Sequence, residues 1–276
     1  MAKPHIIIIG NEKGGAGKTT TSMHLIISLL HLGFKVSSID LDCRQKSLSR
    51  YLENRSNYAA KHSLNLHSPR HFTLADALSA EQGLNQLSEL IAREVEGDCD
   101  FLLIDTPGSN TPLSSYAHSL ADSIITPIND SFLDLDVIAQ IEADSLKIIR
   151  PSFYAQAIWE QKMEKAKRNQ GEINWLVVRN RMSALDAKNK QRMGDVLDRL
   201  SSRLGFRVAL GFNERVIYRE LFLHGLTLLD IKAGISDVTL NLSHITAKQE
   251  LNNLLRNLNV AKLNEALVAL EAGKSG

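Results

Sequence analysis

The most constraining stretch of the sequence lies near its start, where an apolar run meets a glycine-rich segment. Residues 6–9 are four consecutive isoleucines, and such a β-branched run is typical of a strand buried on both faces in a parallel sheet. Gly14, Gly15 and Gly17 follow, and a helical pattern begins directly after them. The chain therefore opens with a strand, a tight loop and a helix, which indicates an α/β fold.

The loop has the composition of a phosphate-binding site. Glycines let several backbone N–H groups turn toward one anion, and the following helix adds its free N–H groups and positive dipole end. Lys18 can reach the β- and γ-phosphates of a nucleoside triphosphate, and the Thr19 hydroxyl can ligate Mg²⁺. A glycine turn that binds no ligand would not explain why a lysine, a hydroxyl, a preceding strand and a following helix all stand where a phosphate-binding loop needs them. The predicted nucleotide-binding residues are Lys13, Gly14, Gly15, Ala16, Gly17, Lys18, Thr19 and Thr20.

The loop departs from the usual P-loop pattern at its first position. That pattern would place a glycine where this chain has Glu12, and a second lysine, Lys13, follows. The departure resembles the deviant Walker A motif of the ParA/MinD family of ATPases. In that family the first lysine reaches across a dimer interface to the partner's nucleotide. The resemblance therefore implies a catalytic role for Lys13 beside Lys18.

Composition and length limit the other classes of protein. The chain has 276 residues, 43% hydrophobic and 23% charged, which fits a globular protein of one α/β domain. No apolar stretch has the length of a membrane span, and the first strand begins too early for a signal peptide, so we expect a cytoplasmic location. Cys43 and Cys99 cannot hold a metal cluster within one chain. A cluster shared by two subunits is conceivable, but free thiols are favoured.

Two acids end the second predicted strand. Residues 17–31 are predicted to form a helix that Gly33 ends, and residues 35–42 a parallel strand. Acids at the carboxyl end of such a strand lie at the ligand edge of the sheet. We expect Asp40 and Asp42 to point to opposite faces and to have different roles. The resemblance places Asp42 in switch I, where it is catalytic, near the metal, and orients the attacking water, with Asp40 near the Mg²⁺ shell or Lys18.

A second motif lies where the apolar residues 101–104 run directly into Asp105-Thr106-Pro107-Gly108. A strand that ends in aspartate is weak evidence by itself. Together with the glycine-rich loop, it resembles a Walker B motif followed by switch II. Asp105 is expected to hold a water on Mg²⁺ or to bond Thr19, and the Gly108 N–H to meet the γ-phosphate.

The remaining elements are assigned more coarsely. Helices are predicted at 48–55, 74–96 and 132–149, and strands at 123–127, 175–178 and 208–210. Residues 61–72 contain three histidines and are expected to be a surface loop. By resemblance, Asn180 after the fifth strand reads the adenine edge, and Arg215 also lies near the base.

Residues 183–204 are predicted to form a helix with one basic face. At about 100° per residue, the side chains of Lys188, Arg192, Arg199 and Arg203 share a stripe, with Lys190 nearby. A basic face is ordinarily only a solvated surface. However, residues 147–219 carry 16 Lys/Arg against 7 Asp/Glu, whereas the rest carries 16 against 24. This excess, and the resemblance, favour non-specific DNA binding without sequence preference.

Further segments narrow the resemblance to the MipZ-like branch of the ParA/MinD family, which positions the division plane. The similar segments are 11–18, 40–45, 127–132, 151–154, 175–181 and 215–222. The similarity runs from residue 6 to about 255 and includes an insert at about 148–171 that ParA proteins generally lack. It implies one P-loop NTPase domain over residues 1–276, with a mostly parallel, doubly wound sheet flanked by helices.

The resemblance also implies a slow ATPase that acts as a regulatory switch. ADP-bound and nucleotide-free chains would be monomers, and ATP would join two chains. The ATP dimer would bind nucleoid DNA and the partition protein ParB and would inhibit FtsZ assembly. The protein would be cytoplasmic and nucleoid-associated, and could form a polar gradient.

Three alternatives stay open. A ParA-type chromosome or plasmid partition ATPase shares the loop, the dimer and the DNA binding. A MinD-like ATPase needs a basic amphipathic C-terminal helix, whereas residues 261–271 carry one lysine and two glutamates, so we expect no membrane partner. A metabolic enzyme, such as a dethiobiotin synthetase-type ligase or a reductase, needs a substrate pocket or cysteine set that the sequence does not indicate.

Overall fold

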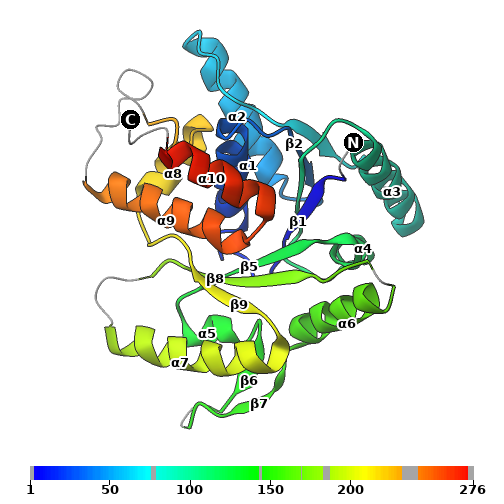
Figure 1. The fold of residues 1–276 in the computed structure, drawn as a ribbon, viewed down its shortest axis with the longest axis vertical. Helices are drawn as coiled ribbons and strands as arrows, with labels where there is room; N and C mark the ends of the chain where they lie inside the picture. Colours follow the sequence, from blue (N-terminus) through cyan, green and yellow to red (C-terminus); the bar gives the residue numbers. More distant parts are fainter. Residues whose placement is uncertain are drawn as a thin grey trace.

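The computed structural model describes residues 3–75, 79–142, 145–168, 170–182, 187–231 and 242–272, but not the side chains of 187–190 and 242–244. Within these residues, seven parallel strands form one sheet, and two short strands form a separate antiparallel hairpin (Figure 1). In spatial order the sheet strands are β3 (Arg70–Thr73), β2 (Val36–Asp40), β4 (Phe101–Asp105), β1 (His5–Ile9), β5 (Ser123–Asn129), β8 (Asn174–Asn180) and β9 (Arg207–Leu210). The hairpin strands are β6 (Ala139–Ile141) and β7 (Ile148–Pro151).

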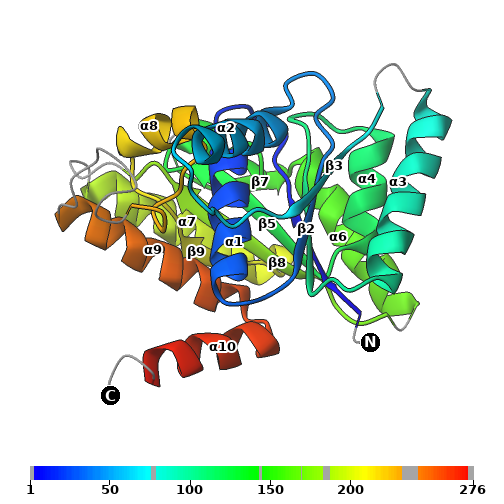
Figure 2. The same ribbon diagram turned by 90° about the horizontal axis from the view of Figure 1, so that it is seen from above.

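Helices cover both faces of the sheet, as Figures 1 and 2 show from two directions. One face is covered by α3 (Ala80–Glu96), α4 (Pro112–Leu120), α6 (Phe153–Lys167) and α7 (Ala187–Leu204). The other face is covered by α1 (Lys18–His31), α2 (Ser47–Lys61), α9 (Leu242–Leu258) and α10 (Ala261–Ala272). The short α5 (Phe132–Leu135) follows β5, and α8 (Ile217–His224) follows β9. This is the predicted single α/β domain with a doubly wound sheet.

The isoleucine run forms the central strand and contributes to both cores. Ile6 and Ile8 pack into the core under α4, α6 and α7, whereas Ile7 and Ile9 pack into the core under α1 and α9. All four side chains are at most 2% exposed. Because strand side chains alternate between faces, only a run without polar residues fits a strand covered on both sides.

Several predicted boundaries were wrong. The segment 132–149 is not one helix, because α5 ends after one turn and β6 and β7 follow. Ile141, Ile148 and Ile149 supply β-branched residues to the two strands, and the backbone N–H of Ser152 donates to the Ile138 carbonyl at the open end of the hairpin. The loop predicted at 61–72 contains most of β3, and the helix predicted to begin at Leu74 begins at Ala80. The proposed start of the basic helix, 183–186, lies outside the described residues.

A buried ion pair joins α2 to the segment after α8. Arg55 donates from Nη2 to Asp230 Oδ1 at 2.8 Å and from Nη1 to Oδ2 at 2.9 Å, and both side chains are at most 3% exposed. Arg55 also donates to the carbonyl of Gly225. Gly225 has φ 66°, and a Cβ at that position would lie 1.9 Å from the backbone nitrogen of Arg55. Only glycine fits this close approach.

No helix among the described residues is both long enough and apolar enough to cross a membrane. The C-terminal helix α10 packs on the domain through Leu263 and Leu267, which are nearly fully buried, as expected for a docking helix. Cys43 is partly buried and Cys99 is buried, and neither forms a disulfide among the described residues.

Candidate nucleotide site

A cleft lies at the carboxyl edge of the central strands, between the glycine-rich loop, β2 and β4. Its lining brings together residues predicted from separate motifs: Gly14, Gly15, Gly17, Lys18, Thr19, Thr20, Asp40, Asp42, Gln45, Ser47, Asp105, Thr106, Gly108 and Arg181. We call it the phosphate cleft. Gly15 and Gly17 have φ of 79° and 88°, in the left-handed region that favours glycine. No described atom lies within 4 Å of the place a Cβ would occupy at Gly14 or Gly15, so this backbone is open to a ligand.

Lys18 closes the loop on itself and faces switch II. Its Nζ donates to the carbonyl of Asn11 at 3.1 Å and lies 3.4 Å from that of Lys13. A Cβ at Gly108 would lie 3.6 Å from this Nζ. Burial lowers the pKa of Lys18, while the nearby Asp105 and Asp42 act in the opposite direction. The structure thus brings the P-loop lysine and the switch II glycine together.

Thr19 and Asp105 form the pair expected beside a metal ion. The Thr19 hydroxyl donates to Asp105 Oδ2 at 3.2 Å. The other oxygen, Oδ1, is buried and has no hydrogen-bond partner among the described residues. Burial, and then the neighbouring Asp40, raise the pKa of Asp105 to about 7. A buried carboxylate oxygen without a donor, next to a hydroxyl, suits the hydrated shell of Mg²⁺.

Asp40 and Asp42 line the same cleft, so the expectation that they point to opposite faces was wrong. Residues two apart in an extended segment share a face. Their contacts differ nonetheless. Asp40 accepts from the Asp42 backbone N–H at 3.0 Å, and Asp42 Oδ1 accepts from the N–H groups of Arg44 and Gln45. Asp42 therefore shapes the loop that the resemblance assigns to switch I.

Lys13 contacts the segment after β5. Its Nζ donates to the Leu133 carbonyl at 3.0 Å and forms an ion pair with Asp134. The lysine side chain is 42% exposed, whereas the Asp134 side chain is only 5% exposed. Of the residues described, those that line the phosphate cleft do not include Lys13. In a single chain, this lysine is therefore held outside its own phosphate site.

A larger cavity of about 580 Å³ adjoins the cleft. It is lined by Gly17, Thr20, Asn180, Arg181, Phe212, Asn213, Glu214, Arg215, Val216, Tyr218, Arg219, Phe222 and Leu223. Gly17, Thr20 and Arg181 line both spaces, so the two are continuous. A mostly apolar cavity of this size next to a phosphate site suits a nucleoside, and we call it the base cavity.

Asn180 and Arg215 both line the base cavity, but their polar groups already have partners. Asn180 Nδ2 donates to the Ala16 carbonyl at 3.1 Å, and its Oδ1 accepts from the Phe212 N–H at 3.0 Å. Arg215 forms two hydrogen bonds with Glu250, at 2.5 and 2.7 Å. Asn180 thus fixes both walls of the site, and its reading of the adenine edge stays a prediction.

The basic stripe on α7 is present where its side chains are described. Arg192, Arg199 and Arg203 are exposed, whereas the apolar side of the helix, from Met193 to Leu204, is buried in the core. The side chains of Lys188 and Lys190 lie outside the described residues.

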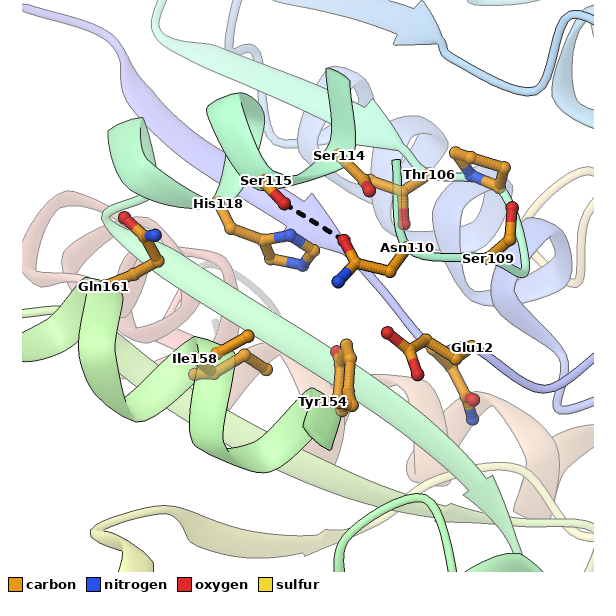
Figure 3. A pocket seen from close by; sticks show the side chains of 13 residues that line it. Glu12, Thr106, Ser109, Asn110, Ser114, Ser115, His118, Tyr154, Ile158 and Gln161 are labelled. Carbon is orange, nitrogen blue, oxygen red and sulfur yellow. Dashed lines mark hydrogen bonds between the residues drawn. The ribbon is translucent and has the colours of Figure 1, made fainter. Parts of the chain in front are cut away.

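A much smaller cavity lies behind the nucleotide loop, between switch II and α6 (Figure 3). Its volume is about 30 Å³, so it has room for water but not for a nucleotide. His118 points into it, and its buried Nε2 has no hydrogen-bond partner among the described residues. Tyr154 forms part of the wall and donates to the Gly10 carbonyl at 2.7 Å.

The geometry agrees with the comparison of the sequence with known families. The sequence profile of the family described as ATPase MipZ matches residues 5–262. The chain is a member of this family. The match covers every motif around the phosphate cleft and the base cavity, together with α5, α6 and α7.

Curated relatives are similar over shorter segments. The chain is 30% identical over 156 residues to the chloroplastic septum site-determining protein minD homolog of Arabidopsis thaliana, covering 54% of this chain and 43% of the relative. It is 29% identical over 154 residues to the chromosome-partitioning ATPase Soj of Thermus thermophilus, covering 51% of this chain and 61% of the relative. The matches thus span about half the length of these relatives.

Solved structures match almost the whole chain. Apo McdA from Cyanothece aligns over 92% of this chain and 99% of that chain, with a TM-score of 0.60 and 17% identity. MinD from Pyrococcus horikoshii, complexed with Mg-ADP, aligns over 96% and 98%, with a TM-score of 0.57 and 20% identity. These likenesses establish the fold as that of MinD/ParA-type P-loop ATPases.

Two residues of the site were missed by sequence reasoning. Asp134 pairs with Lys13 from a segment far along the chain, and no local pattern marks it. Arg181 lies at the junction of the cleft and the base cavity, and no role there was predicted for it from the sequence. Its place directly after Asn180 was the available signal.

Proposed function

We propose that the chain is a switch that dimerises with ATP, hydrolyses ATP slowly and thereby controls where the cell divides. The observation that carries this proposal is the position of Lys13, at the edge of an ATP site but held on Leu133 and Asp134. A lysine placed there can reach the phosphates of a second chain docked over the cleft. Hydrolysis then depends on dimerisation, because the stabilising charge comes from the partner.

The cleft residues support binding of ATP or ADP with Mg²⁺. Lys18 and the backbone of residues 14–17 would hold the phosphates, and Thr19 and Asp105 would hold the hydrated metal ion. When bound, Mg²⁺ would neutralise charge on the phosphates. Asp42, whose backbone is anchored on Asp40, would orient the attacking water.

Membership of the MipZ family supports inhibition of FtsZ assembly as the output of the switch. In this proposal the ATP dimer also binds ParB and, without sequence preference, DNA. Two copies of the basic stripe on α7 would double the number of DNA phosphates that the protein can bind. The protein would then be cytoplasmic, associated with the nucleoid, and able to form a polar gradient.

The second candidate is a ParA-type partition ATPase, which the similarity to the chromosome-partitioning ATPase Soj favours. Sedimentation of GTP-assembled FtsZ with the ATP-bound protein separates the two. A loss of pelleted FtsZ that depends on ATP supports the division switch, whereas unchanged pelleting together with DNA binding supports partition.

The first test is the solution mass of the protein with ADP and with a non-hydrolysable ATP analogue. We expect a dimer only with the analogue, and a monomer in both states for Lys13→Ala. Lys35→Ala, which removes an exposed lysine paired with Asp98, is the matched control and should dimerise like the wild type. A wild-type monomer in every nucleotide state would overturn the proposal.

A further inference from the structure

A chain of hydrogen bonds connects the edge strand β3 to the phosphate cleft. Its centre is His71, whose Nδ1 lies 2.9 Å from the Ser38 hydroxyl and whose Nε2 lies 2.9 Å from the Ser49 hydroxyl. Ser49 is in the first turn of α2, and both its hydroxyl and its backbone N–H donate to Asp40 Oδ2 at 3.0 Å. The other Asp40 oxygen accepts from the Asp42 N–H at 3.0 Å. This series of hydrogen bonds thus reaches the backbone of Asp42, in switch I.

The direction of these hydrogen bonds follows from the number of protons. The Ser49 hydroxyl donates its single proton to Asp40 Oδ2. The Ser49 oxygen can then accept from Nε2–H of His71. Nδ1 of the neutral ring is left as an acceptor for the Ser38 hydroxyl. Burial lowers the pKa of His71 and outweighs Asp40 and the Ser38 backbone, which raise it, so the neutral ring is favoured.

Asp40 is the point at which this chain meets the nucleotide site. Its side chain is 2% exposed, lines the phosphate cleft and holds the backbone of Asp42. Asp42 in turn orders the loop that follows it, because its Oδ1 accepts hydrogen bonds from the backbone N–H groups of Arg44 and Gln45. Among the described residues, no hydrogen bond joins His71 directly to Asp42 or to the cleft lining, so its hydrogen-bonded route to the reaction runs through Ser49 and Asp40.

We propose that His71 is a positioning residue for ATP hydrolysis: through Ser49 it fixes Asp40, and with Asp40 the orientation of Asp42 toward the attacking water. The role rests on the proposed function, because it concerns the hydrolysis step of the ATP-bound dimer. Strand β3 therefore has a role beyond extending the sheet, because it carries the imidazole that positions switch I through Ser49 and Asp40.

The test compares two amides with different reach. In His71→Gln the amide nitrogen extends to about the position of Nε2 and can still donate to Ser49, whereas the shorter His71→Asn cannot. At protein concentrations where every variant is a dimer, we expect kcat to fall about three- to tenfold in His71→Ala and His71→Asn, and less than twofold in His71→Gln. KM for ATP and the affinity for a fluorescent ATP analogue should change less than twofold in all three.

A second variant, Ser49→Ala, removes the hydroxyl that links His71 to Asp40. Because the effect of His71 passes through Ser49, adding His71→Ala to Ser49→Ala should not lower kcat further. Additive losses would overturn the proposal. So would an unchanged kcat in a folded His71→Ala protein, or a fall in nucleotide affinity as large as the fall in kcat.

A spectroscopic readout separates this proposal from the proposed function. Nitrogen NMR of the His71 ring should give the Nε2–H tautomer in the wild type and a shifted Nε2 signal in Ser49→Ala, whatever the ATPase activity. An Nδ1–H tautomer would overturn the hydrogen-bond chain. Absence of hydrolysis by the wild type would overturn the proposed function, and the positioning role with it. Normal wild-type hydrolysis with unaltered variants would overturn the positioning role alone.

Discussion

Lys13 and Asp134 form an ion pair between the nucleotide loop and α5, and the Leu133 carbonyl provides a second acceptor for Nζ at 3.0 Å. The Asp134 carboxylate is nearly buried and also accepts from the Asn129 N–H at 3.0 Å, so its position is fixed. Under the proposed function, this intrachain pair and the partner's nucleotide compete for one ammonium group.

Removal of the charge at Asp134 should therefore favour the ATP dimer. In Asp134→Asn the side-chain oxygen can still accept from Asn129, but the charged pair with Lys13 is broken. For a half-exposed lysine, we expect the dimer dissociation constant to fall about two- to fivefold. Analytical ultracentrifugation with a non-hydrolysable ATP analogue measures this. Asp136→Asn, an exposed acid two residues further on, is the control, and a weaker dimer in Asp134→Asn would contradict the argument.

A methyl group at Gly211 should damage nucleotide binding without touching the nucleotide. A Cβ at that position would lie 2.1 Å from Asn180 Oδ1 and 2.5 Å from Val178 Cγ1. Gly211→Ala therefore displaces the amide that holds Ala16 and Phe212, and we expect at least a tenfold loss of ATP affinity by calorimetry, about 1.4 kcal/mol. Gly83→Ala, where the nearest atom would be 3.5 Å away, should bind ATP normally.

Breaking the buried ion pair of Arg55 and Asp230 should strongly destabilise the domain. Arg55→Met leaves a nearly buried carboxylate without its cation, and we expect the free energy of unfolding to fall by about 3–5 kcal/mol. Adding Asp230→Leu removes that uncompensated charge and should recover part of the loss. Urea unfolding of the single and double variants measures both effects, and a double variant less stable than Arg55→Met would contradict the explanation.

Acid should destabilise the fold through a buried histidine. Burial lowers the pKa of His118 from 6.5 to about 4, so the native ring stays neutral while the unfolded ring takes up a proton below pH 6.5. The stability from this difference is complete above pH 6.5 and is lost as the pH falls toward 4. Between pH 6.5 and 4, the free energy of unfolding of His118→Leu should therefore decrease by up to about 3 kcal/mol less than that of the wild type. Urea titrations at several pH values check the slope, with His224→Leu, at an exposed histidine, as the control.

The basic stripe predicts a salt-dependent affinity for DNA. Arg192→Ala/Arg203→Ala should weaken DNA binding by the ATP dimer and lower the slope of log affinity against log salt by about 0.9 for each DNA phosphate that the variant no longer binds. Arg50→Ala/Lys61→Ala changes the net charge equally at exposed positions on α2 and should leave the slope unchanged. Equal losses of affinity in both variants would indicate a net-charge effect and no DNA site on α7.

The sequence predicted best where composition alone decides burial. The isoleucine run indicated a strand covered on both sides and forms one, and the loop after it uses positive φ angles at Gly15 and Gly17, which favour glycine. It predicted poorly where long-range contacts decide. Strand β3 reads Arg-His-Phe-Thr, a polar edge segment that forms a strand because Val36–Asp40 pairs with it. Neither the Lys13–Asp134 pair nor the Ser38–His71–Ser49 chain has a local signature.

Tyr154 gives the segment 148–171 a structural role that limits how it can be engineered. Its hydroxyl donates to the Gly10 carbonyl and meets the Thr126 hydroxyl at 2.8 Å, so the start of α6 supports the strand end from which the nucleotide loop departs. Excision of the segment to search for a partner would also unseat that loop. A chain trimmed there would lose ATP and partners together, and only surface changes on the exposed side of α6 can tell the two apart.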